Sequence, residues 1–343
     1  MNTPHPLQTD LDFVLERTRK DWEELRGGRL FITGGTGFFG CWLLETFLWA
    51  NQQLGLKAEA VVLTRSAAAF RTRAPNLAGQ SAVHLYEGEL TEFRFPTGTF
   101  SHVIHAAGEL NVTAEPEAMI LTSRQGTERV LELAGKAGAK KLLFTSSGAV
   151  YGPLKGVTAK RSEKETFVEF PDSPRWAYAT AKRNAEAQCV QFARQTGIEV
   201  KIARGFAFLG PYLPLNAHFA AGNFLRDALQ GGPIMVQGSG SAVRSYLYGS
   251  DLALWLWTIL FRGQSGHPYN VGADQPVSIV DLAGAVAKAC DPAPEVRVAN
   301  QPRPDETVDY YVPDTSRARI ELGLVETVDL PAAIRKTLRW HRR

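Results

Sequence analysis

A glycine-rich segment, Thr33–Gly40, constrains the fold of this chain more than any other stretch of its sequence. The apolar run Leu30–Ile32 precedes it, and Cys41–Ala50 follows with apolar residues at helical spacing. This order predicts a strand, a tight turn and a helix. A glycine at every third position lets the backbone turn sharply or approach a neighbour closely, because glycine lacks a Cβ. These glycines are Gly34, Gly37 and Gly40.

Such a turn would direct the free N–H groups at the start of the helix toward one point, which suits a pyrophosphate. Its G-x-x-G-x-x-G spacing is a variant of the fingerprint of dinucleotide-binding proteins. Taken alone, the motif leaves a second interpretation open, namely a glycine-rich turn that binds nothing. The rest of the sequence favours a binding function.

Downstream of the turn, apolar strands alternate with helices. This alternation is typical of an α/β fold with a doubly wound parallel sheet that helices cover on both faces. A ligand of such a sheet binds at the carboxyl ends of the strands. The expected strands are Ala60–Thr64, Val83–Tyr86, His102–His105, Lys141–Thr145 and Glu199–Ala203, and the long expected helices are Thr122–Ala137 and Trp176–Gln195.

The sequence predicts three parts. A helix that Asp10 can cap, and that Gly27 and Gly28 end, forms an N-terminal extension. From Gly205 onward glycine and proline become frequent, which indicates a smaller lobe, and Tyr269–Gly272 would return a strand to the main sheet. The predicted parts are the extension at 1–28, a Rossmann nucleotide-binding domain at 29–204, and a substrate-binding lobe at 205–343 that is partly interleaved with the sheet.

Composition and charge narrow the classes of function. The 343 residues are 44% hydrophobic and 21% charged, as in an ordinary globular chain with a sizeable core. A formal net charge of +3 does not favour nucleic acid or a membrane surface as a partner. The apolar run Leu252–Phe261 is too short to span a bilayer and predicts a buried helix. Three distant cysteines argue against a disulfide framework or a zinc site and favour a cytoplasmic location.

Tyr178 and Lys182 are four residues apart on an expected helix and therefore share a face. A free phenol has a pKa of about 10, and a nearby ammonium lowers that pKa because it favours the phenolate. Such a tyrosine can exchange a proton with a sugar hydroxyl or a carbonyl during hydride transfer. An incidental surface pair remains the alternative, since Tyr-x-x-x-Lys is frequent by chance.

Hydroxyl side chains, Thr145–Ser147, come at the end of an expected strand, where a ligand of the sheet should lie. A serine at this place can hydrogen-bond the same substrate oxygen as the tyrosine. Hydroxyls that merely cap a loop are the alternative interpretation.

In the order of these features the chain resembles the extended short-chain dehydrogenases/reductases of the NAD-dependent epimerase/dehydratase family, which modify nucleotide-diphosphate sugars. The resemblance extends from Gly34 to about Leu322. It rests on Thr33–Gly40, His105–Gly108, Ser146–Ser147 before Val150–Gly152, Tyr178–Lys182, Arg244–Asp251, Arg303–Asp305 and Asp314–Ala318.

The resemblance implies a role for each matching residue. Tyr178 would be the acid/base, Lys182 would hold the nicotinamide ribose and tune Tyr178, and Ser147 would be the hydroxyl partner. The implied cofactor-binding residues are Gly34, Gly37, Phe38, Phe39 and Gly40 at the pyrophosphate, Glu89 and Leu90 at the adenine, and Ala106, Ala107, Gly108 and Thr145 along the cofactor. The implied substrate-binding residues are Ser147, Asn223, Arg244 and Arg303, of which the two arginines would bind the diphosphate.

The residue that ends the second strand departs from the family pattern. Relatives usually carry an acid there for the ribose diol of the adenosine, whereas this chain has Thr64 followed by Arg65. Without a carboxylate a 2′-phosphate is not repelled, and Arg65 can pair with it. The expected cofactor is therefore NAD(P), with NADP slightly favoured and NAD left open.

Gly148 and Ala149 follow Ser147, at the place where the family's 4,6-dehydratases carry an Asp-Glu pair and its glucuronate decarboxylases carry Glu second. Those carboxylates move protons in dehydration or serve decarboxylation, so their absence argues against both reactions. Epimerisation of the 4-epimerase type is then expected, with NADPH-dependent reduction of a 4-keto-6-deoxy sugar as the alternative. A binding module without turnover is least favoured, because Ser147, Tyr178 and Lys182 are all present.

The resemblance also implies a homodimer, because relatives usually dimerise through two helices per subunit. In this chain those helices would be about Glu115–Gly135 and Trp176–Gln195. Ser123 and Ala207 stand where relatives often carry Asn, so the sequence leaves the sugar and the nucleotide base open.

Overall fold

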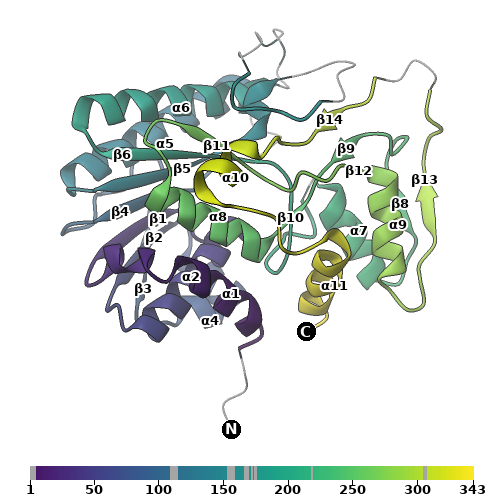
Figure 1. The fold of residues 1–343 in the computed structure, drawn as a ribbon, viewed down its shortest axis with the longest axis horizontal. Helices are drawn as coiled ribbons and strands as arrows, with labels where there is room; N and C mark the ends of the chain where they lie inside the picture. Colours follow the sequence, from purple (N-terminus) through teal and green to yellow (C-terminus); the bar gives the residue numbers. More distant parts are fainter. Residues whose placement is uncertain are drawn as a thin grey trace. The chain divides into compact units, whose positions relative to one another are not determined.

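The computed structural model shows two compact units, each assembled from separate stretches of the chain (Figure 1). The structure describes residues 5–108, 115–152, 159–165, 170, 173, 176–217, 219–303 and 307–343. The first unit combines 1–152, 167–204 and 253–269, and the second combines 153–166, 205–252 and 270–343.

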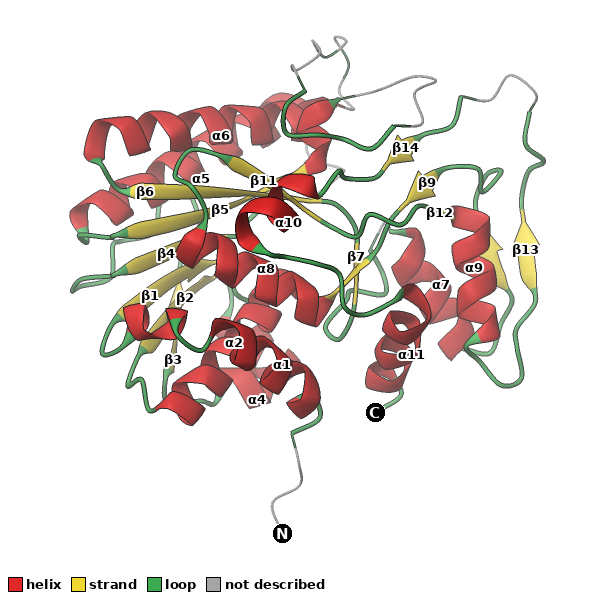
Figure 2. Ribbon diagram, in the orientation of Figure 1, coloured by secondary structure: helices red, strands yellow, loops and turns green. Residues whose placement is uncertain are grey.

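The first unit is built on a parallel sheet of seven strands (Figure 2). The strand order is β11-β6-β5-β4-β1-β2-β3, so the direction of the order reverses between β1 and β4. This architecture confirms the predicted doubly wound α/β fold, whose ligand crevice lies at that reversal. The strands are β1 (Arg29–Thr33), β2 (Glu59–Thr64), β3 (Val83–Glu87), β4 (His102–His105), β5 (Lys141–Ser147), β6 (Glu199–Gly205) and β11 (Pro268–Val271).

Helices cover both faces of this sheet, with α5 and α6 on one face and α1, α2 and α8 on the other (Figure 2). Buried apolar side chains of β1, β4 and β5 pack against α5 and α6, as their near-continuous apolar sequences require. The helices of this unit are α1 (Gln8–Thr18), η1 (Asp21–Leu25), α2 (Phe38–Leu54), α3 (Ala67–Arg73), α4 (Pro75–Ala78), α5 (Pro116–Lys136), η2 (Gly148–Tyr151) and α6 (Ala177–Thr196), with most of α8 (Gly249–Arg262).

The N-terminal extension differs from its prediction. No side chain caps α1, and Asp10 lies buried inside the first turn. The helix ends at Thr18, whose hydroxyl accepts a hydrogen bond from Trp22 Nε1 at 2.9 Å, and the short 3-10 helix η1 follows. Trp22 in turn contacts Trp257 of α8 with ring centroids 4.5 Å apart. The extension therefore consists of two short helices, α1 and η1, and Trp22 of η1 packs against α8.

Most strand and helix boundaries lie close to their predictions. The expected strands agree with β2, β3 and β4 to within one residue at each end, and β11 forms where a returning strand was expected. The larger difference is α5, which begins at Pro116 instead of Thr122. Proline is favourable at the first position of a helix, and the range of about Glu115–Gly135 expected from the resemblance lies closer to the observed start.

The second unit contains small sheets and short helices. Its paired strands form the sets β10-β7, β12-β9-β14 and β13-β8. Among the described residues of the whole chain, no helix has the length and apolar character needed to cross a membrane. The elements are β7 (Phe208–Leu209), α7 (Ala220–Leu229), β8 (Ile234–Val236), β9 (Val243–Arg244), β10 (Leu247–Tyr248), β12 (Val277–Ser278), α9 (Ile279–Lys288), β13 (Val296–Val298), β14 (Tyr310–Tyr311), α10 (Ser316–Leu322) and α11 (Leu330–His341).

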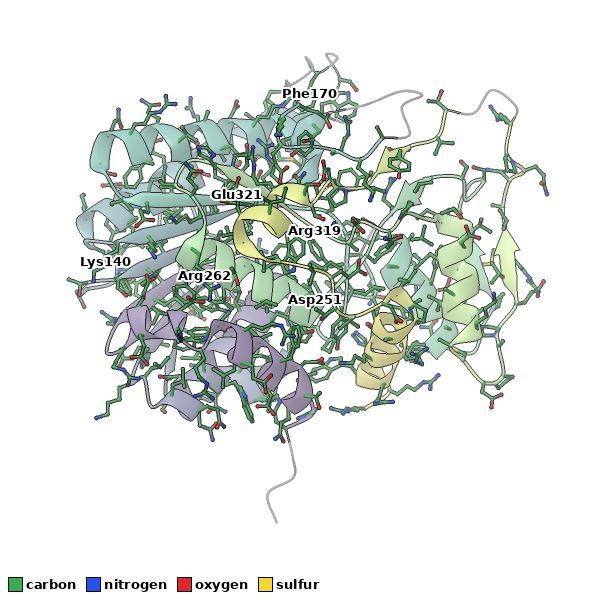
Figure 3. All side chains as sticks on the ribbon, viewed as in Figure 1. Lys140, Phe170, Asp251, Arg262, Arg319 and Glu321 are labelled. Carbon is green, nitrogen blue, oxygen red and sulfur yellow. The ribbon has the colours of Figure 1, made fainter. Side chains whose placement is uncertain are left out.

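A buried carboxylate orders the loop before α11 in this unit. Asp251 is fully buried and labelled in Figure 3. It accepts hydrogen bonds from the Thr327 amide at 2.9 Å, the Thr327 hydroxyl at 2.6 Å and the Val328 amide at 3.1 Å. A buried acid is tolerated when its oxygens are satisfied in this way, so Asp251 fixes the chain that enters α11.

We predict that Asp251→Asn lowers the free energy of unfolding by about 1–3 kcal/mol, because asparagine has one acceptor oxygen and its amide nitrogen cannot accept the bond that the second carboxylate oxygen accepts from Thr327. Urea denaturation monitored by far-UV circular dichroism measures the change. Glu295→Gln is the control: this exposed acid pairs with exposed Arg297 at 2.8 Å, and its loss should change stability by less than about 0.5 kcal/mol. Equal stabilities of the two variants would contradict the role of Asp251.

Candidate functional site

The glycine turn packs against the ends of neighbouring strands so closely that side chains are excluded. A Cβ on Gly34, which has φ +70°, would lie 2.4 Å from the Ala106 carbonyl, just after β4. A Cβ on Gly40 would lie 2.3 Å from the backbone of Gly35. Gly37 caps the start of α2. The turn therefore brings the N-terminus of α2 to the switch point between β1 and β4, where a pyrophosphate can meet free N–H groups.

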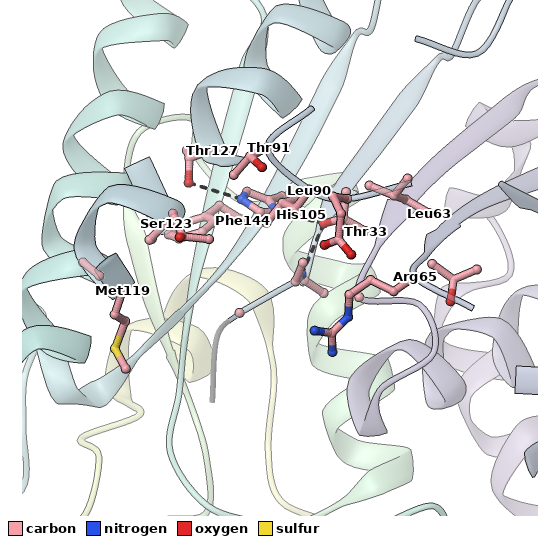
Figure 4. A pocket seen from close by; sticks show the side chains of 18 of the residues that line it. Thr33, Leu63, Arg65, Leu90, Thr91, His105, Met119, Ser123, Thr127 and Phe144 are labelled. Carbon is pink, nitrogen blue, oxygen red and sulfur yellow. Dashed lines mark hydrogen bonds between the residues drawn. The ribbon is translucent and has the colours of Figure 1, made fainter. Parts of the chain in front are cut away.

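A cavity of about 580 Å³ opens at this place (Figure 4), a volume typical of a cofactor site. The first unit supplies every residue that lines it. The predicted site residues that line it are Gly34, Arg65, Glu89, Leu90, Ala106, Ala107, Gly108, Tyr178 and Lys182. The other lining residues are Thr33, Thr36, Leu63, Thr64, Gly88, Thr91, His105, Met119, Thr122, Ser123, Thr127, Phe144 and Ala181.

Six predicted cofactor or catalytic residues lie outside the lining of this cavity. Four belong to the turn and the first turn of α2, and they are Gly37, Phe38, Phe39 and Gly40. The other two are buried on β5, and they are Thr145 and Ser147. The backbone carbonyl of Thr145 accepts a hydrogen bond from Lys182, and the Ser147 hydroxyl bonds Tyr178. Thr145 and Ser147 are therefore linked to the cavity through two residues that line it.

Ser147, Tyr178 and Lys182 are brought together at the end of β5 by α6. The Ser147 side chain hydrogen-bonds the Tyr178 phenol. Lys182 is buried, and its Nζ donates to the Thr145 carbonyl at 2.9 Å. The Lys182 ammonium lies 5.9 Å from the centroid of the Tyr178 ring. This arrangement can pass a proton between the phenol and a hydroxyl or carbonyl held beside Ser147.

The protonation of these groups differs from the sequence expectation in one respect. Burial raises the pKa of Tyr178, and the hydrogen bond from Ser147 opposes the rise only in part. Burial also lowers the pKa of Lys182 to about 8, with the Glu186 carboxylate acting in the opposite direction. The phenol pKa is thus raised instead of lowered in this structure, since burial outweighs every favourable interaction of the phenolate.

The sequence assigned no role to a buried histidine that lines the cavity. His105 Nδ1 lies 2.8 Å from the Thr33 hydroxyl and His105 Nε2 lies 3.2 Å from the Thr127 hydroxyl (Figure 4). The Thr33 hydroxyl also accepts the Ala107 amide N–H at 3.2 Å. Burial lowers the pKa of His105 to about 3, so the ring is neutral at physiological pH. The ring therefore links β1, β4 and α5 beneath the turn that contains Ala107.

The signal for this link was present in the sequence. Thr33 and His105 each end an apolar strand, and the two strands are neighbours at the reversal of strand order, where Thr33 pairs with His105. Only the strand order, which the sequence alone does not give, makes the two residues neighbours.

We predict that His105 makes the protein sensitive to acid. The unfolded histidine takes up a proton as the pH falls below about 6.5, whereas the folded one stays neutral until about pH 3, so stability is lost on acidification. At pH 5 this linkage amounts to about 2 kcal/mol relative to pH 7.5. Urea denaturation at both pH values should show a correspondingly smaller loss for His105→Asn. The exposed His267→Asn should retain the wild-type loss, and an unchanged loss in His105→Asn would contradict the assignment.

Side chains of α5 also line the cavity and were not among the predicted site residues. They include Met119 and Thr122. Ser123, which the sequence comparison with the family singled out, lines the cavity beside them. At the opposite side, Arg65 precedes α3, and the Glu87 carboxylate there accepts the Ala67 amide at 2.8 Å. Arg65 and Glu89, the basic and acidic side chains of this part of the lining, thus follow the neighbouring strands β2 and β3.

The three predicted substrate residues outside the first unit belong to the second. Asn223 on α7 accepts a hydrogen bond from Arg226 at 3.2 Å. Arg244 on β9 pairs with Asp309, with Nη2 2.6 Å from the carboxylate. Arg303 is exposed. The role of each toward a sugar nucleotide remains a prediction, and for Arg244 the Asp309 carboxylate already provides an anionic partner.

The model of the NAD-dependent epimerase/dehydratase family matches residues 30–272, and the chain belongs to this family. It is 28% identical over 332 residues to UDP-glucuronic acid decarboxylase 1 of Xenopus tropicalis, covering 96% of this chain and 74% of that protein. It is 30% identical over 304 residues to UDP-glucuronic acid decarboxylase 6 of Arabidopsis thaliana, covering 88% of this chain and 85% of that protein.

Solved structures of the same fold include UDP-glucose 4-epimerase of Thermotoga maritima with UDP-glucose, at a TM-score of 0.75 and 22% identity, covering 92% of this chain and 98% of that one. Another is the dTDP-glucose 4,6-dehydratase DesIV of Streptomyces venezuelae with NAD bound, at a TM-score of 0.75 and 24% identity, covering 92% and 97%. At these identities the likeness establishes the fold. The family is NAD-dependent, and the cavity of about 580 Å³ that Gly34 lines has a volume that suits a dinucleotide.

Proposed function

We propose that this protein is an NAD(P)-dependent enzyme that modifies a nucleotide-diphosphate sugar as a 4-epimerase. The observation that supports the proposal most directly is the group of Ser147, Tyr178 and Lys182 beside a dinucleotide-sized cavity. Family membership and relatives named for UDP-sugars favour the same substrate class. Assignment of Asn223, Arg244 and Arg303 to the sugar nucleotide follows from the resemblance.

The residues of the site suit reversible oxidation of a sugar hydroxyl. When bound, the nicotinamide would accept hydride from the sugar carbon and return it. Tyr178 would take the hydroxyl proton as the carbon is oxidised and give a proton back on reduction. Ser147 would hold the same oxygen, and Lys182 would stabilise the phenolate that forms. In an epimerase the keto sugar would turn before the hydride returns to its other face.

The residues after Ser147 favour epimerisation over dehydration or decarboxylation. Ala149 carries no acid, and its amide donates to Ser147 Oγ at 3.2 Å. Of the described residues that line the cavity, Glu89 alone is a carboxylate, and it follows β3 near Arg65. Apart from Glu89, the described residues of this lining offer no carboxylate to move a second proton.

Decarboxylation is the second candidate, because the two relatives reported above are UDP-glucuronic acid decarboxylases that match most of the chain. Reduction of a 4-keto-6-deoxy sugar by NADPH is the third, favoured by Arg65 at the rim of the cavity. A homodimer through α5 and α6 is a prediction from the resemblance, as is the cytoplasmic location.

Product analysis by proton NMR with UDP-, dTDP-, GDP- and CDP-hexoses, UDP-glucuronic acid and 4-keto-6-deoxy sugars tests the proposal. We expect a new hexose isomer without net consumption of cofactor. A pentose product with release of carbon dioxide would establish the decarboxylase, and stoichiometric oxidation of NADPH would establish the reductase. Tyr178→Phe should lower kcat at least about 100-fold and leave NAD affinity within about twofold. Tyr86→Phe, on β3 and outside the cavity lining, is the matched control; full activity of Tyr178→Phe would remove the mechanism.

The choice of cofactor provides a separate prediction. If Arg65 binds a 2′-phosphate, Arg65→Ala should weaken NADP binding about 10- to 100-fold and leave NAD binding unchanged, because one charge-assisted contact is lost. Isothermal titration with each cofactor measures both affinities. Arg71→Ala, an exposed arginine of α3, serves as the control. Equal loss for the two cofactors, or none, would contradict the preference for NADP.

A further inference from the structure

The turn that follows Ser147 is fastened to α6 by an arginine next to Lys182. Arg183 Nε donates to the Val150 carbonyl at 2.7 Å. The Arg183 guanidinium also lies 3.6 Å from the centroid of the Phe170 ring, and Phe170, labelled in Figure 3, stacks on Trp176 immediately before α6. These contacts hold η2, which begins after Ser147, at a fixed place against the first turns of the helix that contains Tyr178.

A buried ion pair fastens the same turn to α6 from the side of β6. Arg204 on β6 donates through Nη1 to the Tyr151 hydroxyl at 3.0 Å. Its Nε and Nη2 donate to the two oxygens of Glu186 on α6 at 2.9 and 2.7 Å. Glu186, Arg204 and Tyr151 are each at most 6% exposed. The bidentate geometry fixes both distance and angle, so η2, β6 and α6 meet at one guanidinium.

Glu186 also acts on Lys182, which lies one helical turn before it. The groups that face Lys182 are Tyr178, Glu186 and Cys189 from α6, the neutral His105 from β4, and Phe144 with the Thr145 carbonyl from β5. Glu186 is the carboxylate among them, and it counteracts the lowering of the Lys182 pKa by burial. The ion pair thus acts on the site in two ways. Arg204 hydrogen-bonds the Tyr151 hydroxyl, and the Glu186 carboxylate favours the charged form of Lys182.

We infer that Arg183 and the Glu186–Arg204 pair are positioning residues that hold the Ser147 hydroxyl against the Tyr178 phenol. The catalytic consequence of this inference rests on the proposed function. Stability alone does not explain the pair, since a buried ion pair is often no more stabilising than apolar residues of the same volume. A displacement of Ser147 by about 1 Å, in contrast, is enough to lower a catalytic rate about 100-fold.

The first test uses two variants. Arg183→Lys keeps the charge but loses the Nε donor to Val150 and the planar group over Phe170. Tyr151→Phe keeps the ring but loses the hydroxyl that Arg204 bonds. We expect kcat to fall roughly 10- to 100-fold with KM and NAD affinity within about threefold, because neither residue lines the cofactor cavity. Arg194→Lys is the matched control for Arg183→Lys: it makes the same change on an exposed arginine of α6. It should retain wild-type kcat, and wild-type kcat in the two test variants would overturn the inference.

A second readout does not depend on the sugar substrate. Ultraviolet difference titration of wild type against Tyr178→Phe isolates the ionisation of Tyr178. If Arg183→Lys and Tyr151→Phe weaken the Ser147 hydrogen bond, the Tyr178 titration should move up by about half to one pH unit, as it should in Ser147→Ala. If the Tyr178 titration does not move in these variants, the inference is overturned, whether or not a sugar nucleotide is turned over. If the titration moves as expected but the protein turns over none of the sugars, only the proposed function is overturned.

The ion pair itself needs a variant that is sure to fold. Glu186→Gln alone leaves Arg204 with an uncompensated buried charge and is expected to unfold more easily. Glu186→Leu/Arg204→Leu removes both charges and keeps apolar volume. A double variant with near wild-type thermal stability but a kcat lowered at least about tenfold supports positioning. Recovery of both stability and kcat would show that the pair has a structural role only.

Discussion

The contact between the backbone of Gly34 and the carbonyl of Ala106 is the interaction on which the rest of the site depends. The turn after β1 and the turn after β4 meet at the one place where the strand order reverses, and there is no room for a Cβ between them. A side chain at residue 34 would push the two strand ends apart. The cavity, the N-terminus of α2 and the threonine–histidine link beneath them all form around this close approach.

Below that contact, buried polar side chains that hydrogen-bond one another support the site. His105 connects two threonine hydroxyls, and one of those hydroxyls receives the amide of the turn beside the cavity. A neutral imidazole suits this place, because a charged ring would be desolvated and would face the Lys182 ammonium. The turn beside the cavity is thus held by directional bonds and not only by apolar packing.

The sequence predicted the apolar framework better than the polar one. Strands such as β4 were found because buried parallel strands are continuous apolar runs, and Tyr178 and Lys182 were paired because helical spacing is local. Thr33 and His105 meet only through strand order, and Arg204 meets Glu186 only because β6 lies beside α6. Asp10 was misjudged as a cap because an acid in the first turn of a helix is favourable both as a cap and inside the turn.

Under the proposed function, the outcome that follows oxidation of a sugar would depend on groups that differ between members of one family. Identity of 28–30% to decarboxylases reflects a shared fold and a shared order of motifs. The chemistry that would follow oxidation, however, depends on the residues of the site and not on the fold. Ala149 contributes a backbone amide directed at Ser147 and no carboxylate. Under the proposed function, the Ser147 hydroxyl and the Tyr178 phenol would be the groups that exchange a proton with the oxygen of the keto sugar, which is what reversible hydride transfer requires.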